Sequence, residues 1–387
     1  MRRLACAIQE YEWGHPTWLP DLLDQPERKG RPSAELWMGA HPSAPSKVDG
    51  VGLDRLIVEA PIANLGSDVS ARFGQLPYLF KVLAIDRALS IQSHPSLEQA
   101  RAGFARENEA QTPLDAPNRT YRDDNHKPEM ICAVTPFEAL CGFRSLVDAH
   151  GLLDALSTPA LEPLRAILSA SGEPQQRFAA SLEYLLRLET VDATVLVDEV
   201  VAAMGSCSDP RYLHVTQSLQ RVASDYPDDV GVVVGLLLNH ITLEPGQALF
   251  LGPGNLHAYL SGVGVELMAN SDNVIRGGLT PKHIDLDELL AVVDCSPLEV
   301  PTENPTSSAH TFSSPVEEFA LSRVDLSAGG SMSVVGPAIV LLTEGSAGGV
   351  CKGQPVFIAA GDHPWALTGT GMAWVATVGR PHETPLA

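Results

Sequence analysis

The spacing of apolar residues divides the chain into segments of two kinds. Between residues 146 and 231, apolar residues recur every three or four positions, as they do along the buried face of an amphipathic helix. In "QQRFAASLEYLLRL" and "VLVDEVVAAM" the residues that follow this spacing are Phe178, Leu182, Leu185, Leu186, Leu196, Val197, Val200, Val201 and Met204. The pattern predicts a small helical domain over residues 146–231.

Short apolar runs between glycines and prolines dominate the rest of the chain. Residues 1–145 contain "LPYLFKVLAI" and "EMICAV". The same texture returns from about residue 232, where Glu244-Pro245-Gly246 marks a tight turn between two apolar runs. Residues 311–387 repeat this texture in "VVGPAIVLLTEGSAGG" and "GQPVFIAAGDHPWALTG". Many short strands with such turns are typical of jelly rolls made of two sheets. The sequence therefore predicts a mainly β protein with an inserted helical domain.

One helix is expected within residues 1–145. The segment "SLEQARAGFARENEA" opens with Ser96, a residue type that caps helix N-termini, and has Glu98 in its first turn. The remainder of residues 1–145 is expected to be strands and loops.

Composition narrows the class of protein. Of the 387 residues, 44% are hydrophobic and 19% are charged, as in ordinary globular proteins, and the length favours two or three domains. The net charge of −21 leaves no basic face for nucleic acid. The six cysteines are scattered without a C-x-x-C pair, and no apolar run approaches membrane-spanning length. We therefore expect a cytoplasmic protein with reduced thiols and neither a nucleic-acid nor a membrane partner.

A polar pair interrupts the apolar texture in "LSIQSHPSLEQA". Gln92 and His94 lie two residues apart, so on a strand they face the same side. The pair is either a hydrogen-bonded polar patch or half of a metal site.

Two further donors favour the metal site. The segment from Gly246 to His257 resembles the second cupin motif, a strand and a tight turn followed by a histidine, although Gly252 stands where that motif has proline. Glu129 precedes the apolar run of "EMICAV". Nitrogen and oxygen donors of this kind suit zinc and do not exclude iron or manganese.

Together these segments resemble the type I phosphomannose isomerases, the zinc-dependent mannose-6-phosphate isomerases of the cupin superfamily. The resemblance covers most of residues 1–290 and rests on "YEWG", "AELWMGAHPSAPS", "LPYLFKVLAIDRALSIQSHP", "DDNHKPEM", "FLGPGNLHAYL" and "SDNVIRGGLTPKH". It implies cupin-type jelly-roll β-barrels, with a catalytic domain formed by residues 1–145 and 232–310. The helical domain at 146–231 is then an insertion, and residues 311–387 form a C-terminal cupin-like β domain.

The resemblance also implies roles for individual residues. The matching zinc ligands, for one Zn²⁺ per chain, are Gln92, His94, Glu129 and His257. Positions that match groups contacting substrate are Ser90 and Lys282 for the phosphate, Arg276 for catalysis, Lys127 and Glu266 for substrate handling or proton transfer, and Trp13 for the pocket wall.

The expected function is reversible aldose–ketose isomerisation of mannose 6-phosphate and fructose 6-phosphate through a metal-stabilised enediolate. Lys127 is one candidate for the base, and Glu266 and His126 are the alternatives. The expected partner is a small sugar phosphate, and the chain is expected to be a monomer. Two other functions remain open, a non-catalytic sugar-phosphate sensor and a metal-dependent cupin oxygenase.

Overall fold

Two antiparallel sheets carry most of the strands in the computed structural model, which describes residues 1–380. The smaller sheet gathers strands from the C-terminal part of the chain and one from its start. In spatial order it consists of β1 (Arg2–Arg3), β21 (Val356–Ile358), β18 (Ala338–Leu342), β24 (Met372–Thr377), β16 (Ala320–Asp325) and β15 (Ala309–Thr311). The N-terminal strand thus pairs with the C-terminal part of the chain.

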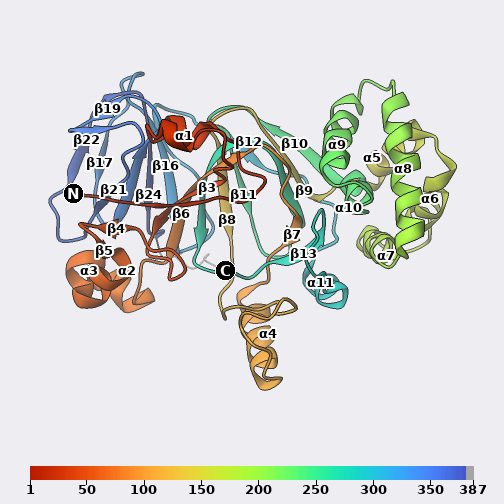
Figure 1. The fold of residues 1–387 in the computed structure, drawn as a ribbon, viewed down its shortest axis with the longest axis horizontal. Coiled ribbons are helices and arrows are strands. Elements are labelled where there is room, and N and C mark those ends of the chain that lie inside the picture. Colours follow the sequence, from red (N-terminus) through yellow and green to blue (C-terminus); the bar gives the residue numbers. More distant parts are fainter. Residues whose placement is uncertain (381–387) are drawn as a thin grey trace, which may run out of the picture.

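The larger sheet lies between the smaller sheet and the helices of residues 146–234 (Figure 1). Its main path runs through β14 (Thr302–Glu303), β11 (Ala248–Leu251), β8 (Glu129–Ala133), β12 (His257–Ala269), β6 (Tyr78–Ile85), β3 (Glu35–Gly39) and β2 (Ala7–Gln9). Branches from this path are β7 (Ile91–Ser93), β9 (Phe137–Phe143), β10 (Leu238–Leu243) and β13 (Ile275–Gly278).

Three small sheets complete the β structure among residues 1–380. They are formed by β4 (Lys47–Val48) with β5 (Val51–Gly52), by β17 (Met332–Val334) with β22 (Trp365–Leu367), and by β19 (Ser346–Ala347) with β20 (Val350–Cys351) and β23 (Gly369–Thr370).

Strand β12 joins the two halves of the larger sheet. Its first residues pair with β7 and β9, whereas the part from Gly262 to Ala269 pairs with β6. At the change of partner, Gly262 has a φ of 107°, and a Cβ there would lie 2.4 Å from the carbonyl oxygen of Pro136. Glycine therefore allows one strand to serve both halves and to carry His257 and Glu266 into the same part of the molecule.

Six helices form the expected helical region, at the opposite end of the molecule from the smaller sheet (Figure 1). They are α5 (Leu146–Leu156), α6 (Glu162–Leu168), α7 (Pro174–Leu186), α8 (Thr190–Ser206), α9 (Leu213–Asp225) and α10 (Gly231–Val234). The apolar residues named from the sequence face inward here, since Phe178, Leu182 and Val200 are fully buried. The prediction of antiparallel sheets with a helical region is confirmed.

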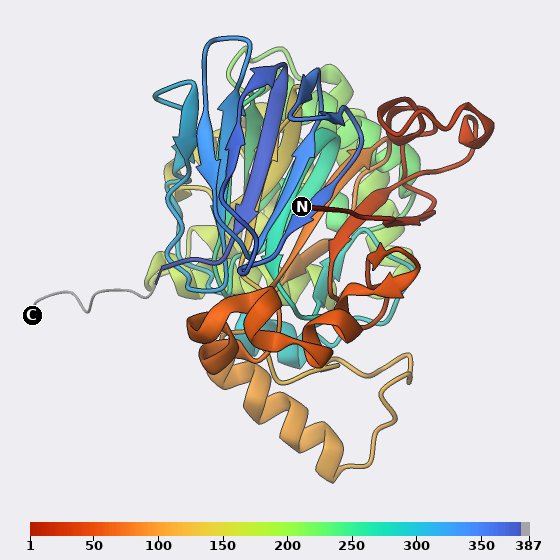
Figure 2. The ribbon, with the colours of Figure 1, turned by 90° about the vertical axis from the view of Figure 1, so that its left-hand side faces the viewer.

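Helix α4 (Leu97–Glu109) is also confirmed, and it projects from the body of the molecule (Figure 2). The Ser96 side chain accepts a hydrogen bond from the Gln99 amide, while the Gln99 side chain accepts one from the Ser96 amide. This reciprocal pair is the capping box that fixes where a helix begins.

The expectation of a single helix within residues 1–145 is wrong. That segment also contains α1 (Trp18–Leu22), α2 (Leu53–Glu59) and α3 (Pro61–Phe73), and α11 (Leu286–Val292) follows later. In α2 and α3 the buried pairs Leu53 and Ile57, and Leu65 and Val69, each have the i, i+4 spacing of a helix face. Within residues 1–380, none of the helices combines the length and the apolar character needed to cross a membrane.

A carboxylate on β9 ties the helical region to the larger sheet. Glu138 Oε2 accepts hydrogen bonds from Ser218 Oγ at 2.8 Å and from Arg221 Nη2 at 2.6 Å, both on α9. The His240 imidazole, with Nε2 3.6 Å from the same oxygen, is the largest influence on this carboxyl group. Together with Ser218 and Arg221 it lowers the pKa of Glu138 to about 2, against the opposing effect of burial.

Replacing Glu138 by glutamine should weaken the fold at neutral pH and not at strongly acidic pH. Because the pKa is lowered in the folded protein, the carboxylate stabilises the fold above its unfolded value of about 4.3. That contribution is lost as the pH falls towards about 2. We expect Glu138→Gln to lower the free energy of unfolding at pH 7 by about 1–3 kcal/mol, measured by urea unfolding between pH 7 and pH 3.

The matched control is Glu183→Gln, which removes a carboxylate from the exposed pair with Arg187 and should cost less than about 0.5 kcal/mol. A loss for Glu138→Gln that stays constant down to pH 3 would contradict the assigned role of its charge.

Candidate functional site

A cavity of about 1300 Å³ opens on the larger sheet. Its wall is completed by residues 225–229, at the end of α9 and just after it, and by residues 279–282, which follow β13. Most of the site residues expected from the sequence line it, namely Trp13, Ser90, Gln92, Lys127, Glu129, Glu266, Arg276 and Lys282. The other two, His94 and His257, contact Glu129 in the wall.

Three of the expected metal ligands meet at the wall of the cavity, which Glu129 lines. Glu129 Oε1 lies 3.3 Å from His94 Nε2, and Glu129 Oε2 lies 3.5 Å from His257 Nε2. One ligand atom from each residue falls within 4.8 Å of the other two, and all three side chains are buried. They come from β8, from the residue after β7 and from the start of β12, so the sheet brings them together.

The hydrogen bonds of the two imidazoles leave Nε2 free in each case. His94 Nδ1 lies 2.8 Å from the carbonyl oxygen of Asn273, and His257 Nδ1 lies 3.0 Å from that of Asn255. Since a carbonyl only accepts, each Nδ1 carries the hydrogen and each Nε2 presents a lone pair. Such bonds to the second ring nitrogen are typical of histidines that bind metals.

Burial and charge keep His94 and Glu129 in the protonation states that a metal requires. Burial, assisted by the nearby Lys127 ammonium, lowers the pKa of His94 to about 4, so this imidazole is neutral at pH 7. Burial alone would raise the pKa of Glu129, but Lys127 and His94 hold it well below its usual range. The Lys127 Nζ atom lies 3.1 Å from Glu129 Oε1.

These residues fit a zinc ion. Among the described residues, His94 Nε2, His257 Nε2 and Glu129 Oε2 have no hydrogen-bond partner although they are buried. Burying unpaired polar atoms is unfavourable, and a cation between them would remove that cost. Two neutral imidazoles and one carboxylate form a donor set that zinc uses in catalytic sites.

Gln92 is placed beside this group by strand register. It pairs with His257 on one side and with Arg276 on the other, so β13, β7 and β12 carry the three residues in one row. Residues directly opposite each other on paired strands face the same side of the sheet. Gln92 lines the cavity and lies in position to be the fourth ligand expected from the sequence.

A buried charge cluster also lines the cavity, and its lysine, Lys81, was not expected from the sequence. Lys81 on β6 lies directly opposite Glu266 on β12, with Nζ 3.0 Å from Glu266 Oε2 and 3.5 Å from Glu35 Oε2. Trp37 Nε1 donates a hydrogen bond to Glu35. The available signal was Lys81 itself, the one charged residue in the apolar run "LPYLFKVLAI".

The protonation states within this cluster differ from those of exposed groups. Burial alone would lower the pKa of Lys81, but Glu266 and Glu35 raise it, so Lys81 stays charged. Burial raises the pKa of Glu266, and Lys81 offsets only part of that effect. Glu266 is therefore a weakly acidic carboxyl group that faces the cavity.

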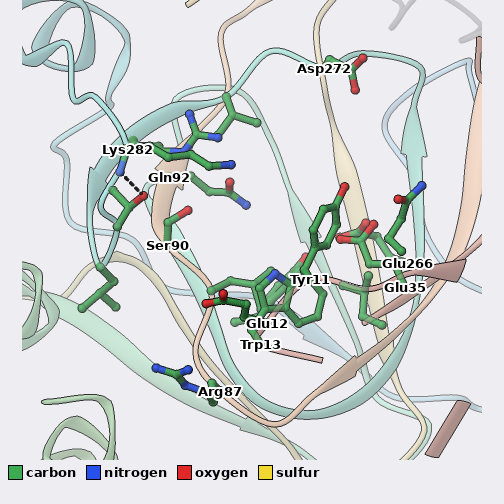
Figure 3. A pocket seen from close by; sticks show the side chains of 18 of the residues that line it. Tyr11, Glu12, Trp13, Glu35, Arg87, Ser90, Gln92, Glu266, Asp272 and Lys282 are labelled. Carbon is green, nitrogen blue, oxygen red and sulfur yellow. Dashed lines mark hydrogen bonds between the residues drawn. The ribbon is translucent and has the colours of Figure 1, made fainter. Parts of the chain in front are cut away.

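A group of cations occupies a different part of the cavity. Figure 3 shows Lys282, Gln92 and Ser90 on one side and Glu35 and Glu266 across from them. Two arginines, Arg276 and Arg122, complete the lining on the cationic side.

Arg122 was not expected from the sequence. Its backbone amide donates to Asn273 Oδ1 at 2.7 Å, and one end of its guanidinium donates to the carbonyl oxygen of Leu114 at 2.8 Å. Burial and then the charge of Arg122 lower the pKa of Arg276, and burial, Arg276 and Arg122 lower that of Lys282. Within residues 1–380, none of these three cations forms an ion pair with a carboxylate, so the group is available for an anionic ligand.

His126 lies apart from the cavity. Its Nε2 atom is 2.7 Å from Oε1 of Glu318, which lies between β15 and β16 of the smaller sheet. The residues that line the cavity include Lys127 and Glu266 but not His126. Of the three candidates for the base, two therefore face the ligand space.

Comparisons with known proteins agree with this geometry. The type I phosphomannose isomerase catalytic-domain family matches residues 1–146. Mannose-6-phosphate isomerase of Escherichia coli strain K12 is 37% identical over 390 residues, covering 96% of this chain and 98% of that protein. Mannose-6-phosphate isomerase 1 of Arabidopsis thaliana is 34% identical over 406 residues, covering 93% and 89%.

A solved structure is similar over the whole fold. The crystal structure of mannose 6-phosphate isomerase from Salmonella typhimurium, bound to its substrate fructose 6-phosphate and to zinc, has a TM-score of 0.88. Its sequence is 37% identical, and the match covers 98% of this chain and 100% of that chain. The fold and the site are those of a metal-dependent sugar-phosphate isomerase. The chain belongs to the type I phosphomannose isomerase family.

The metal site generates a first prediction about activity. Purified protein should carry about one zinc ion per chain, and His257→Ala and Glu129→Ala should each lose both the metal and turnover. The reason is that each variant removes one buried metal ligand from a site that has few other ligands. Elemental analysis and an isomerase assay measure the two effects.

His363→Ala is the matched control, because His363 is exposed and has no part in the site. Full turnover in a chelator-treated sample without residual metal would contradict the prediction.

Proposed function

We propose that this chain interconverts mannose 6-phosphate and fructose 6-phosphate with one bound zinc ion. The observation that carries the proposal is the presence, in one cavity, of a buried His–Glu–His donor group and of a cation group that has no carboxylate partner among residues 1–380. The donor group can hold a metal ion next to a sugar oxygen, and the cation group can bind a phosphate.

The phosphate is proposed to bind at the cationic side of the cavity. Ser90 offers a hydroxyl donor, Lys282 and Arg122 offer charge, and all three line the space. Fixing a group that does not react orients the rest of the substrate, so binding energy from the phosphate contributes to the rate. Trp13 supplies part of the apolar wall.

The reaction moves a proton between C1 and C2 of the open-chain sugar. Glu266 is proposed as the base that takes this proton from one carbon and returns it to the other. Its raised pKa makes it a stronger base than an exposed glutamate, and Lys81 at 3.0 Å holds its orientation. The ammonium of Lys127 would donate to a substrate oxygen.

Gln92, His94, Glu129 and His257 would hold the zinc ion, which would supply a Lewis acid for negative charge on the substrate oxygens. Arg276 is proposed to assist by donating to the oxygen on which charge develops in the enediolate. Its position in the same row as Gln92 and His257 supports this role.

Finer features of the fold and the assembly are part of the proposal. We propose that the larger sheet forms the catalytic cupin jelly roll, from residues 1–145 and 232–310, with residues 146–231 inserted. Residues 311–387, of which 381–387 lie outside the described residues, would form a second cupin-like domain around the smaller sheet. The chain is proposed to act as a monomer in the cytoplasm.

The test of the function is conversion of mannose 6-phosphate in heavy water, with product formation and deuterium incorporation followed together. We expect both for the parent protein and a loss of turnover of about a hundredfold or more for Arg276→Ala, as when one oxyanion donor is removed. The Michaelis constant should change much less.

Arg101→Ala, on the exposed face of α4, is the control for the loss of an arginine. A parent protein that converts no sugar phosphate would leave the sensor function. A parent that converts the sugar only when it consumes oxygen would instead indicate the oxygenase.

Lys282→Ala should act mainly on binding. Removing one charge-assisted hydrogen bond to the phosphate is expected to cost about 1.5–3 kcal/mol, seen as a higher Michaelis constant with unchanged zinc content. Steady-state kinetics on mannose 6-phosphate provide the measurement, with Lys352→Ala on the C-terminal side of the chain as control. An unaltered Michaelis constant would remove Lys282 from the phosphate site.

A further inference from the structure

The segment that carries Lys282 leaves the sheet in an unusual backbone conformation. Within β13 the pairing with β7 is irregular between Arg276 and Gly278, and Leu279, the first residue after the strand, has a φ of 53°. A left-handed conformation is unfavourable for leucine, so other contacts must hold it. Lys282 lies three residues further on, and its position depends on this turn.

Asp229 holds the turn from the helical region. Its Oδ2 atom accepts a hydrogen bond from the backbone amide of Thr280 at 2.9 Å, and its Oδ1 atom accepts one from the amide of Gly231 at 2.7 Å. Thr280 Oγ1 in turn accepts from the amide of Lys282 at 3.1 Å. Figure 3 draws this last bond beside Lys282. One carboxylate therefore connects the helical region to the cation proposed to bind the phosphate.

The backbones at this junction are in close contact. A Cβ on Gly231 would lie 2.6 Å from the amide nitrogen of Leu279, and one on Gly278 would lie 2.7 Å from the Cα of Gly231. The Leu279 side chain is 1% exposed and belongs to the apolar core that also contains Leu219 of α9. The turn is fixed on one side by this core and on the other by Asp229.

The segment that contains Asp229 also contacts the chain just before Ser90, the other residue proposed to bind the phosphate. Arg87 Nε donates to Asp225 Oδ1 at 3.0 Å, and the Tyr226 hydroxyl donates to the carbonyl oxygen of Ala88 at 2.6 Å. Ala88 lies two residues before Ser90. Residues 225–229 thus contact both chain segments from which Ser90 and Lys282 enter the cavity.

Charge alone would give Asp229 the opposite effect. It lines the cavity as an anion, so its direct interaction with a phosphate is repulsive. If its carboxylate favours binding, it must do so by holding the Thr280 amide and the turn.

We propose that Asp229 is a positioning residue that holds the Gly278–Lys282 turn in the conformation that binds the substrate phosphate, so that the helical insertion completes the phosphate site. This inference rests on the proposed function for the identity of the substrate. It gives the helical region a part in substrate binding.

The experiment compares Asp229→Asn and Asp229→Ala with the parent in mannose 6-phosphate kinetics. Both should raise the Michaelis constant by about tenfold while the turnover number stays within about threefold. Asparagine keeps the size of the side chain, but its NH₂ group would face one of the two amide donors. Zinc content should not change, which separates this effect from damage to the metal site.

Asp228→Asn is the matched control. Asp228 lines the same cavity and is exposed, and the structure shows no side-chain hydrogen bond or ion pair for it within residues 1–380. Its φ of 66° is one that asparagine tolerates. Loss of the Asp228 charge should leave the Michaelis constant the same as in the parent protein or should lower it. The two neighbouring acids are thus expected to change phosphate binding differently, which a general effect of charge would not produce.

Several results would overturn the inference. A lower Michaelis constant for Asp229→Asn, as for Asp228→Asn, would show that Asp229 acts through charge alone. A loss of turnover or zinc with an unchanged Michaelis constant would show a role elsewhere. Asp229→Asn also decides the matter if Asp229→Ala fails to fold.

A calorimetric titration with inorganic phosphate separates this inference from the proposed function. A parent protein without isomerase activity would overturn the function. The positioning role would then stand if Asp229→Asn binds phosphate about tenfold more weakly than the parent. It would fall if the two bind equally or if the parent binds no phosphate.

Discussion

The site depends on three buried polar atoms that face one another without a hydrogen-bond partner among residues 1–380. Left alone, His94 Nε2, Glu129 Oε2 and His257 Nε2 would oppose folding, because each has lost water and gained nothing. The surrounding structure nevertheless fixes them in place. Carbonyl groups orient both imidazoles through Nδ1, and Lys127 keeps Glu129 charged at the cavity wall. The fold thus maintains an arrangement that becomes favourable when a cation binds.

The same cavity must accept an anion in a protein of net charge −21. It does so by separating opposite charges across its width. The carboxylates of Glu35 and Glu266 both pair with Lys81 on one wall, while Arg276 and Lys282 on the cationic side have no carboxylate partner among the described residues. Because field strength depends on near charges more than on the distant total, this local arrangement outweighs the global charge.

Sequence reasoning succeeded where the signal was local. The 3.6-residue period located the helical region, Ser96 located the start of α4, and the spacing of Gln92 and His94 marked one strand end. It failed where a contact depends on the register between strands that are far apart in the sequence, as for Lys81 opposite Glu266. It also failed where a loop of one region contacts another region, as for Arg122 and Asp229. Helices α2 and α3 were missed although their i, i+4 apolar pairs are readable. The position of His126 next to Lys127 in the chain did not indicate which way its side chain faces. The imidazole contacts Glu318 and does not face the cavity.

The helical region shares its core with the larger sheet, which carries the candidate site. Its apolar core contains Leu152 and Phe178 from the helices together with Leu140 and Ile275 from strands of the larger sheet. Ile275 directly precedes Arg276, and Leu279 of the same core directly precedes Thr280. Packing in the helical region therefore sets the backbone positions from which Arg276 and Lys282 reach the cavity. A substitution deep among these helices can change substrate binding without touching substrate, because interiors are close-packed and pass small displacements to their neighbours.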